Sequence, residues 1–296
     1  MRAVAIGSTG QLGSDIMRVW PAGDRIGLSH ADIEVTDRER VLDILRAHAP
    51  DLVLSTAAFH NVDLCESEPE RAFQVNAAGA VHLADACREL DAALMFISTD
   101  YVFAGDLGRA YVESDPPTPV NVYGTSKAAG EQLIRTRLDR HYIVRTSGLY
   151  GEAGSGGKGG NFVQRMLELG RRGKDLRVVN DQVLSPTLTY DLAQQLLELA
   201  RTGRYGTYHV TNGGACSWYE FTAKIFALTG TEASLSPTTT AEFGATARRP
   251  AYSVLCNAAT KEAGLPLLRE WPEALADYLH RKGELQPHIQ AREDQR

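Results

Sequence analysis

Short apolar runs alternate with amphipathic stretches along the first half of the chain. Several runs are apolar at nearly every position, which is typical of strands buried on both faces. The expected strands lie at residues 3–6, 25–28, 52–54, 93–97 and 142–144. Between them, apolar residues recur at helical spacing at residues 12–19, 38–47, 69–90 and 123–138. This βα alternation predicts an α/β fold, a Rossmann-type doubly wound parallel sheet with helices on each side.

The pattern changes after Tyr150. Residues 151–160 hold six glycines and no apolar periodicity, so they form either a surface loop or a mobile lid. Beyond them we expect helices at 161–171 and 189–200, a strand at 176–179, and short helices and loops over the remainder. A smaller, partly discontinuous α/β substrate domain is therefore predicted. The expected division is a dinucleotide-binding domain at 1–146 and 187–210, a substrate-binding domain at 147–186 and 211–285, and a tail at 286–296.

A glycine-rich turn links the first expected strand to the first expected helix. It reads GSTGQLG, with glycines at Gly7, Gly10 and Gly13. Such glycines let the backbone approach a pyrophosphate, whose charge then lies at a helix N-terminus. Because the turn lies in the first strand–turn–helix unit, it favours a dinucleotide site over a plain tight turn.

The residues after the second expected strand bear on the choice of cofactor. An acidic side chain roughly 20 residues beyond the glycines favours NAD, because it can bind the ribose hydroxyls. Asp32 and Glu34 lie in that range, as does His30, and no arginine directly follows the strand to bind a 2′-phosphate. The sequence therefore permits NADPH, NADH or both.

Tyr123 and Lys127 are four residues apart on an expected helix, so their side chains share one face. An ammonium beside a phenol favours phenolate and lowers the pKa of the tyrosine, which suits Tyr123 to proton transfer at a carbonyl. Lys127 can also bind the ribose hydroxyls of the nicotinamide nucleotide. Thr99 lies at a strand end, where open α/β sheets place their ligands, and can donate a hydrogen bond to the same carbonyl oxygen.

Composition and charge narrow the class of protein. The chain has 296 residues, of which 43% are hydrophobic and 23% charged, as in ordinary globular proteins. Its formal net charge of -6 argues against nucleic-acid and anionic-membrane partners. No signal peptide is expected, and no apolar run approaches the roughly 18 residues of a membrane span. Four widely spaced cysteines are typical of reduced thiols, so a cytoplasmic protein is expected.

Six segments of the chain together resemble one family. In chain order they read GSTGQLG, AAFHNVDLCESEP, FISTDYVFAG, NVYGTSKAAGE, VVNDQVLSPT and ARRPAYSVL. They are similar to the extended short-chain dehydrogenase/reductases, and within these to the dTDP-4-dehydrorhamnose reductases. The resemblance extends to about Leu279. The combination of STDYVF with NVYGTSK is much more specific than a bare tyrosine–lysine pair.

The resemblance implies hydride transfer from NAD(P)H to C4 of dTDP-4-dehydro-L-rhamnose, which yields dTDP-L-rhamnose. It implies that Tyr123 donates the proton, that Lys127 binds the cofactor and tunes Tyr123, and that Thr99 assists at the substrate oxygen. It also implies that Asp100 contacts the sugar and that Arg249 meets the nucleotide diphosphate. Cofactor contacts are implied at Gly7, Gly10, Gln11, Leu12, Gly13, Glu34, Val35, Ala57, Ala58, Phe59, Tyr123 and Lys127.

Three positions depart from the family pattern. Gly148, a candidate substrate-binding position, stands where the family often has a tryptophan near the sugar. Phe59-His60 replaces the usual Tyr-Thr, and His60 is interpreted as a channel or structural residue rather than a catalytic one. Glu34 stands where aspartate is common. Two alternatives stay open: a reductase or epimerase of another nucleotide sugar, or a non-catalytic regulatory subunit resembling the beta subunit of methionine adenosyltransferase.

The sequence does not decide the assembly or a metal requirement. A monomer and a homodimer are both compatible with it. Some members of the family dimerise through Mg²⁺ bound by surface carboxylates, and Asp15 falls near one such position. A single acidic residue is more typical of a solvated surface charge, so Mg²⁺ is allowed but no metal site is predicted.

Overall fold

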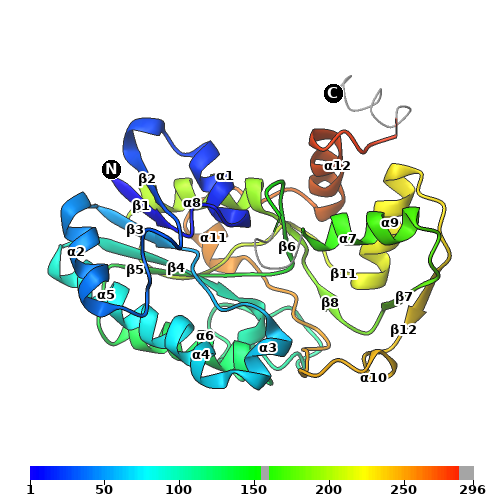
Figure 1. The fold of residues 1–296 in the computed structure, drawn as a ribbon, viewed down its shortest axis with the longest axis horizontal. Coiled ribbons are helices and arrows are strands. Elements are labelled where there is room, and N and C mark those ends of the chain that lie inside the picture. The colour runs from blue at the N-terminus through cyan, green and yellow to red at the C-terminus, as the bar shows by residue number, and fades with distance from the viewer. Residues whose placement is uncertain (155–159, 287–296) are drawn as a thin grey trace.

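The computed structural model describes residues 1–154 and 160–286 of the chain. A six-stranded parallel sheet forms one end of the molecule, with strand order β10-β5-β4-β3-β1-β2 (Figure 1). Its strands are β1 (Ala3–Ile6), β2 (Arg25–Leu28), β3 (Leu52–Ser55), β4 (Ala93–Thr99), β5 (His141–Thr146) and β10 (Gly206–His209). From β1 the chain adds β2 on one side and then β3, β4, β5 and β10 on the other, so the strand order reverses between β1 and β3. This reversal is typical of a doubly wound fold, and the predicted fold class is confirmed.

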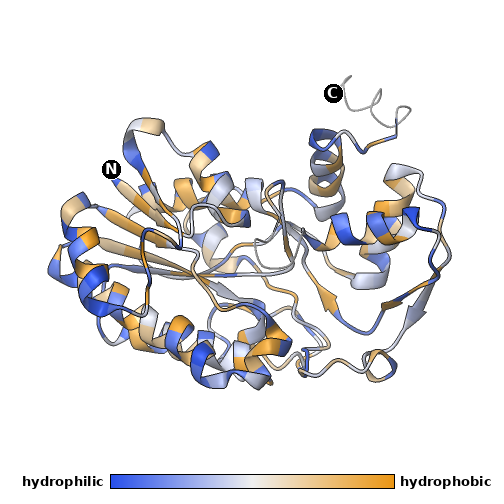
Figure 2. Cartoon of the chain, viewed as in Figure 1, coloured by the Kyte–Doolittle hydropathy of each residue, from blue (hydrophilic) through white to orange (hydrophobic). Residues whose placement is uncertain are grey.

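Helices cover both faces of this sheet (Figure 1). One face packs against α1 (Gln11–Val19) and α8 (Thr189–Thr202), and the other against α2 (Arg38–His48), α5 (Gly79–Glu89) and α6 (Val122–Arg135). Alternate residues of β1 enter the two cores, which explains why that strand is apolar at every position. Figure 2 shows mostly hydrophobic strands between helices that carry hydrophilic residues outward.

Shorter elements complete this half. They are η1 (Ala22–Asp24), α3 (Val62–Ser67), α4 (Pro69–Phe73), η2 (Gln74–Ala78), η3 (Asp100–Val102) and α11 (Ala258–Glu262). The single helix expected over 69–90 is interrupted, because η2 is a π-helical turn between α4 and α5. The sequence did not indicate α3, a helix of 6 residues that is too short to show a period.

A second core lies at the other end of the molecule (Figure 1). It is built around α7 (Phe162–Arg171), α9 (Trp218–Thr229) and α12 (Trp271–Arg281). The remaining elements are α10 (Thr240–Phe243) and the strand pairs β7 (Leu176–Val179) with β12 (Leu235–Thr238), β8 (Val183–Leu184) with β11 (Cys216–Ser217), and β6 (Leu149–Tyr150) with β9 (Thr187–Leu188).

The expectation of short helices and loops over the remainder is wrong for α9 and α12, which span 12 and 11 residues. The sequence of α9, WYEFTAKIFALT, is apolar around much of its circumference, so the helical period is weak there. The expected domain boundaries stay a prediction.

Two sequence interpretations fall largely outside the described residues. Residues 155–159 belong to the glycine-rich segment, so the choice between a surface loop and a lid stays open. Residues 287–296 make up nearly all of the expected tail. Within the part of the chain that the structure describes, no helix has the length and apolar character needed to cross a membrane.

Candidate active site

Helix α6 carries Tyr123 and Lys127 and begins beside the carboxyl end of β4. The Asn121 side chain caps it by accepting a hydrogen bond of 2.7 Å from the Gly124 amide. A Cβ on Gly124 would lie 2.0 Å from the Tyr101 carbonyl oxygen, so only glycine permits this approach. The close contact brings Tyr123 to the turn that begins at Thr99.

The Thr99 side chain lies beside the Tyr123 phenol and interacts with it. This interaction lowers the pKa of the phenol, but desolvation is the larger effect and raises that pKa above its ordinary value. The buried Asp100 carboxylate raises it further. The expected lowering of the Tyr123 pKa by the neighbouring lysine is therefore wrong, because burial has the larger effect. A protonated Tyr123 is the form that can donate a proton.

Lys127 lies one turn further along α6 and is 1% exposed. Its Nζ is 3.8 Å from the centroid of the Phe96 ring, and no described residue accepts a hydrogen bond from it. Burial lowers the pKa of this amine to about 7, against the opposing effect of the Glu131 carboxylate. A buried amine without an acceptor is suited to bind the ribose hydroxyls of a nicotinamide nucleotide, so Lys127 fits the expected cofactor.

Asp100 is 3% exposed and joins three segments of the chain. Its carboxylate accepts hydrogen bonds from the hydroxyls of Thr99 at 3.1 Å, Ser147 at 2.8 Å and Ser253 at 2.6 Å. Burial raises its pKa to about 6, and the three hydroxyls oppose that effect. These partners give Asp100 a role in holding Thr99, and the implied contact with a sugar stays a prediction.

The glycine-rich turn has the geometry of a close backbone approach. Gly7 has a φ of +82°, and a Cβ on it would lie 2.4 Å from Thr56 Oγ1. A Cβ on Gly13 would lie 2.0 Å from the Gly7 carbonyl oxygen. No side chain caps α1, whose N-cap is Gly10, so its first amides stay available to an anion. This cradle fits a pyrophosphate.

Gln11 and Leu12, the first residues of α1, occupy different environments. Gln11 Nε2 donates a hydrogen bond of 3.0 Å to the Leu149 carbonyl oxygen, which ties the turn to β6. Leu12 is 4% exposed and packs in the core under α1. Contacts of either residue with a pyrophosphate stay a prediction.

The expected adenine and channel residues follow β2 and β3. Glu34 Oε1 accepts hydrogen bonds from the amide and hydroxyl of Thr36, and Val35 is buried. Ala57, Ala58 and Phe59 extend from the end of β3, and His60 beyond them is exposed. The structure brings these residues to the same edge of the sheet as the glycine-rich turn, because β1, β2 and β3 are parallel neighbours.

Sequence reasoning missed Asn76, which is fully buried in η2. Its amide accepts a hydrogen bond of 2.9 Å from the Phe59 backbone and donates one of 2.9 Å to Ser126 Oγ. The Ser126 hydroxyl in turn donates to the Tyr123 carbonyl oxygen at 2.8 Å. Asn76 thus links the expected cofactor channel to the helix of Tyr123, and no local sequence signal marks it.

A buried ion pair was also missed. Glu131, two turns beyond Tyr123, binds Arg145 of β5 through three contacts of 2.7–3.2 Å. It also accepts a hydrogen bond of 2.6 Å from Ser98, next to Thr99. The pair therefore fixes α6 against both strands that end at the site. The only sequence signal for this pair was that Glu131 lies four residues beyond Lys127 on the expected helix.

The two expected substrate residues outside the sheet differ in their surroundings. Gly148 has a φ of +55°, and a Cβ on it would lie 2.6 Å from Leu184 Cδ1. A larger residue such as tryptophan would therefore strain the backbone and require Leu184 to shift. Arg249 Nη2 donates to Asp63 Oδ2 at 2.8 Å. The roles of both residues toward a substrate stay predictions.

Asp15 is not the solvated surface charge that the sequence suggested. It is 4% exposed and accepts a short hydrogen bond of 2.5 Å from the Thr189 hydroxyl of α8. Burial raises its pKa. In the described ranges, no group of three or more His, Cys, Asp or Glu residues is arranged to hold a metal ion.

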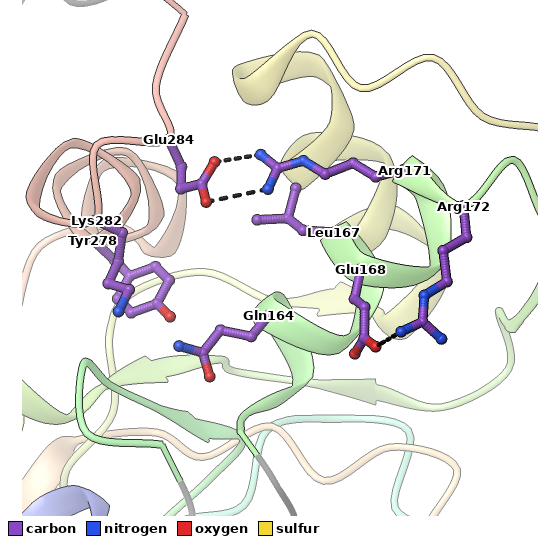
Figure 3. A pocket seen from close by; sticks show the side chains of 8 residues that line it. All are labelled: Gln164, Leu167, Glu168, Arg171, Arg172, Tyr278, Lys282 and Glu284. Atoms are coloured by element: carbon purple, nitrogen blue, oxygen red, sulfur yellow. Dashed lines mark hydrogen bonds and ion pairs between the residues drawn. The ribbon is translucent and has the colours of Figure 1, made fainter.

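A separate pocket of about 540 Å³ lies between α7 and α12 (Figure 3). Arg171 pairs with Glu284 across it, and Arg172 pairs with Glu168. It is lined by Gln164, Leu167, Glu168, Arg171, Arg172, Tyr278, Lys282 and Glu284. None of the predicted site residues lines it, so it lies apart from the candidate active site.

Known proteins resemble this chain over nearly its whole length. The family described as "RmlD substrate binding domain" matches residues 1–283. Spore coat polysaccharide biosynthesis protein SpsK of Bacillus subtilis (strain 168) is 41% identical over 283 residues, covering 95% of this chain and 98% of that protein. A dTDP-4-dehydrorhamnose reductase of Streptomyces griseus is 40% identical over 288 residues, covering 93% of this chain and 92% of that protein.

A solved structure has nearly the same fold. It is the dTDP-4-dehydrorhamnose reductase of Bacillus anthracis str. Ames in complex with NADP. The two chains superpose with a TM-score of 0.91 at 36% sequence identity, covering 95% of this chain and 99% of that one.

Proposed function

The chain belongs to the RmlD substrate binding domain family, and from that premise we propose that it reduces a nucleotide-linked 4-keto sugar with NAD(P)H. The substrate is dTDP-4-dehydro-L-rhamnose and the product is dTDP-L-rhamnose. The relative from Streptomyces griseus, which is named for this reaction, supports the substrate. The NADP in the structure from Bacillus anthracis supports the cofactor.

One observation carries the proposed mechanism. Lys127, a buried amine without an acceptor among the described residues, lies one helical turn from Tyr123, whose phenol lies beside Thr99. When bound, NAD(P)H supplies the hydride. Tyr123 donates the proton to the carbonyl oxygen. The Thr99 hydroxyl turns from Asp100 to donate a hydrogen bond to the same oxygen. Lys127 binds the ribose hydroxyls and holds the nucleotide beside Tyr123.

The decisive experiment measures NADPH oxidation with freshly generated dTDP-4-dehydrorhamnose. Tyr123→Phe removes the proton and should lower kcat by about 10²–10⁴-fold, while the affinity for NADPH stays unchanged. Tyr205→Phe is a matched control, because Tyr205 is 39% exposed and lies at the outer edge of the sheet beside β10. Turnover by Tyr123→Phe at the wild-type rate would refute the mechanism.

A second nucleotide sugar is the main alternative, because Gly148 leaves no tryptophan beside the sugar. A panel of dTDP-, UDP- and GDP-linked 4-keto sugars separates the two. Higher kcat/KM with a sugar carried by UDP or GDP would replace the substrate proposed here. A regulatory subunit is disfavoured by the complete set of Thr99, Tyr123 and Lys127. The regulatory-subunit hypothesis would be supported by stable co-purification with a synthetase together with no NADPH oxidation on any keto sugar.

The setting of the reaction is part of the proposal. We place it in the cytoplasm, where a nucleotide sugar and NAD(P)H are both available. The protein acts there as a monomer or homodimer, with no nucleic-acid or membrane partner. Sedimentation of the purified protein, with and without Mg²⁺, tests the assembly.

A further inference from the structure

Helix α3 contacts three parts of the candidate site. Glu66 Oε1 accepts a hydrogen bond of 2.8 Å from the Val122 amide at the start of α6. Cys65 Sγ lies 3.4 Å from the Phe59 carbonyl oxygen in the expected cofactor channel. Asp63 contacts Ala247 and Arg249, which come from the C-terminal part of the chain. A helix of 6 residues thus joins segments that a reaction at Tyr123 needs together.

Asp63 uses both carboxylate oxygens to hold this segment. Oδ1 accepts a hydrogen bond of 3.0 Å from the Ala247 amide, and Oδ2 accepts one of 2.8 Å from Arg249 Nη2. Arg249 Nη1 also donates to the Ala247 carbonyl oxygen at 3.1 Å. Nearby, Asn121 Nδ2 donates to the Arg248 carbonyl oxygen at 2.8 Å, so the segment is fixed at several points.

The guanidinium of Arg249 lies near the candidate active site. Its positive charge lowers the pKa of the neighbouring Tyr101 phenol, against the larger effect of burial. The Tyr101 ring packs edge-on against the Tyr123 ring, with 6.1 Å between centroids. The Arg249 side chain is 18% exposed, so part of it can still reach a ligand.

A fixed guanidinium is well suited to a diphosphate. Arginine offers five donors in a planar fork, and those not used by Asp63 and Ala247 can reach phosphate oxygens. A free arginine loses much rotamer freedom when it binds an anion, whereas one already held loses little. Holding the side chain in advance therefore strengthens binding.

We propose that Asp63 is a positioning residue that holds Arg249 ready for the diphosphate of the nucleotide-sugar substrate. This inference rests on the proposed function. The Asp63 carboxylate also repels an anion, which works against binding. That repulsion is screened because the Asp63 side chain is 46% exposed, so the positioning effect dominates.

The test uses dTDP as the probe for the diphosphate site and NADPH as the probe for the intact fold. The variants are Asp63→Ala, Asp63→Asn, Arg249→Ala and the double variant of Asp63→Ala with Arg249→Ala. Asp91→Asn is the matched control, because Asp91 pairs with Arg140 at 2.7 Å and is 92% exposed. Titration calorimetry gives both affinities, and steady-state assays with the keto sugar give KM and kcat.

We expect Arg249→Ala to weaken dTDP binding by about 10–100-fold, as for the loss of a charged hydrogen bond. Asp63→Ala should weaken it by about 5–10-fold, with a similar rise in KM, kcat within about twofold, and an unchanged affinity for NADPH. Asp63→Asn keeps an acceptor for the Ala247 amide and should fall between wild type and Asp63→Ala. The double variant should bind dTDP no more weakly than Arg249→Ala alone.

Tighter dTDP binding by Asp63→Ala would overturn the inference, because it would mean that repulsion dominates. Additive losses in the double variant would also overturn it, since Asp63 would then act without Arg249. Both results leave the proposed function intact if the wild type binds dTDP and reduces the keto sugar. A wild-type chain that binds NADPH but not dTDP contradicts the proposed function together with the inference.

Discussion

The amine of Lys127 lies 3.8 Å from the centroid of the Phe96 ring and has no hydrogen-bond acceptor among the described residues. Glu131, one turn further along α6, interacts with Ser98 and Arg145 instead. Lys127 is therefore buried without a hydrogen-bonded counter-charge. A ligand that offers acceptors to this amine removes an unfavourable feature of the ligand-free protein.

Lys127→Met should stabilise the ligand-free protein near neutral pH and abolish its activity. The pKa of Lys127 is about 7 in the folded protein against an ordinary value of 10.5, so the unfolded chain binds the extra proton between these values. The contribution of Lys127 to stability thus rises with pH from about 7 to 10.5. The variant should lose this dependence in urea unfolding and should bind NADPH at least about tenfold more weakly.

The exposed Lys174 provides a control for the loss of a lysine as such. Lys174→Met should leave the pH dependence of unfolding and the affinity for NADPH at wild-type values. If NADPH stabilised Lys127→Met and the wild type equally, Lys127 would not be a cofactor ligand.

Thr99→Val should lower turnover by about 100-fold, as for the removal of one donor to a reacting oxygen. When Tyr123 is deprotonated, the Thr99 hydroxyl can turn from Asp100 and donate to the phenolate, so loss of this hydroxyl raises the pKa of the phenol further. In the oxidation direction, where Tyr123 must be deprotonated, the pH–rate profile should shift to higher pH. Thr99→Ser retains the hydroxyl and should stay within a few fold of wild type. Identical pH profiles for the two variants would argue against this role.

Gly148→Ala should destabilise the protein more than Gly203→Ala. Both glycines have left-handed φ values, of +55° and +64°, so each substitution carries the backbone cost of about 1 kcal/mol. Only Gly148 adds a steric clash, because its Cβ would lie 2.6 Å from Leu184 Cδ1, whereas nothing lies within 4 Å at Gly203. We expect a further loss of about 1–3 kcal/mol at Gly148 in urea unfolding. Equal losses would mean that Leu184 moves away freely.

Asp100→Asn should remove a pH dependence of stability in the acid range. The pKa of Asp100 is about 6 in the folded protein against an ordinary value of 3.8, so folding favours the protonated form. Its contribution to stability is full below 3.8 and is lost as pH rises through about 6. The loss is on the order of 2–3 kcal/mol. Unfolding of wild type and variant at pH values across this range gives the difference directly, and a constant difference would contradict the prediction.

The regular parts of the fold could be predicted because their signals are local. Strands β1 and β7 have the bounds that their apolar runs indicated, and the turn at Gly7 lies where its glycines placed it. The spacing of Tyr123 and Lys127 put them on one helix, which the structure confirms. Each of these features depends only on residues that lie close together in the sequence.

The links that hold the candidate site depend on contacts that no local pattern contains. Asp63 and Arg249 are 186 residues apart, and Asp100 and Ser253 are 153 apart. Asn76 reaches both Phe59 and Ser126 only because η2 packs against α6. Only the folded chain brings such partners together.

The ionisation of Tyr123 shows most clearly the difference between what the sequence determined and what the tertiary structure decided. The sequence by itself determined that a phenol and an amine share one helix face beside a nucleotide turn, because backbone geometry fixes that spacing. The tertiary structure decided their protonation. Desolvation in the packed protein raises the pKa of Tyr123 and lowers that of Lys127. Burial arises only when the core is assembled, so the spacing alone could not reveal it. Its effect on the pKa of Tyr123 is larger than the lowering by Lys127 that the spacing had suggested.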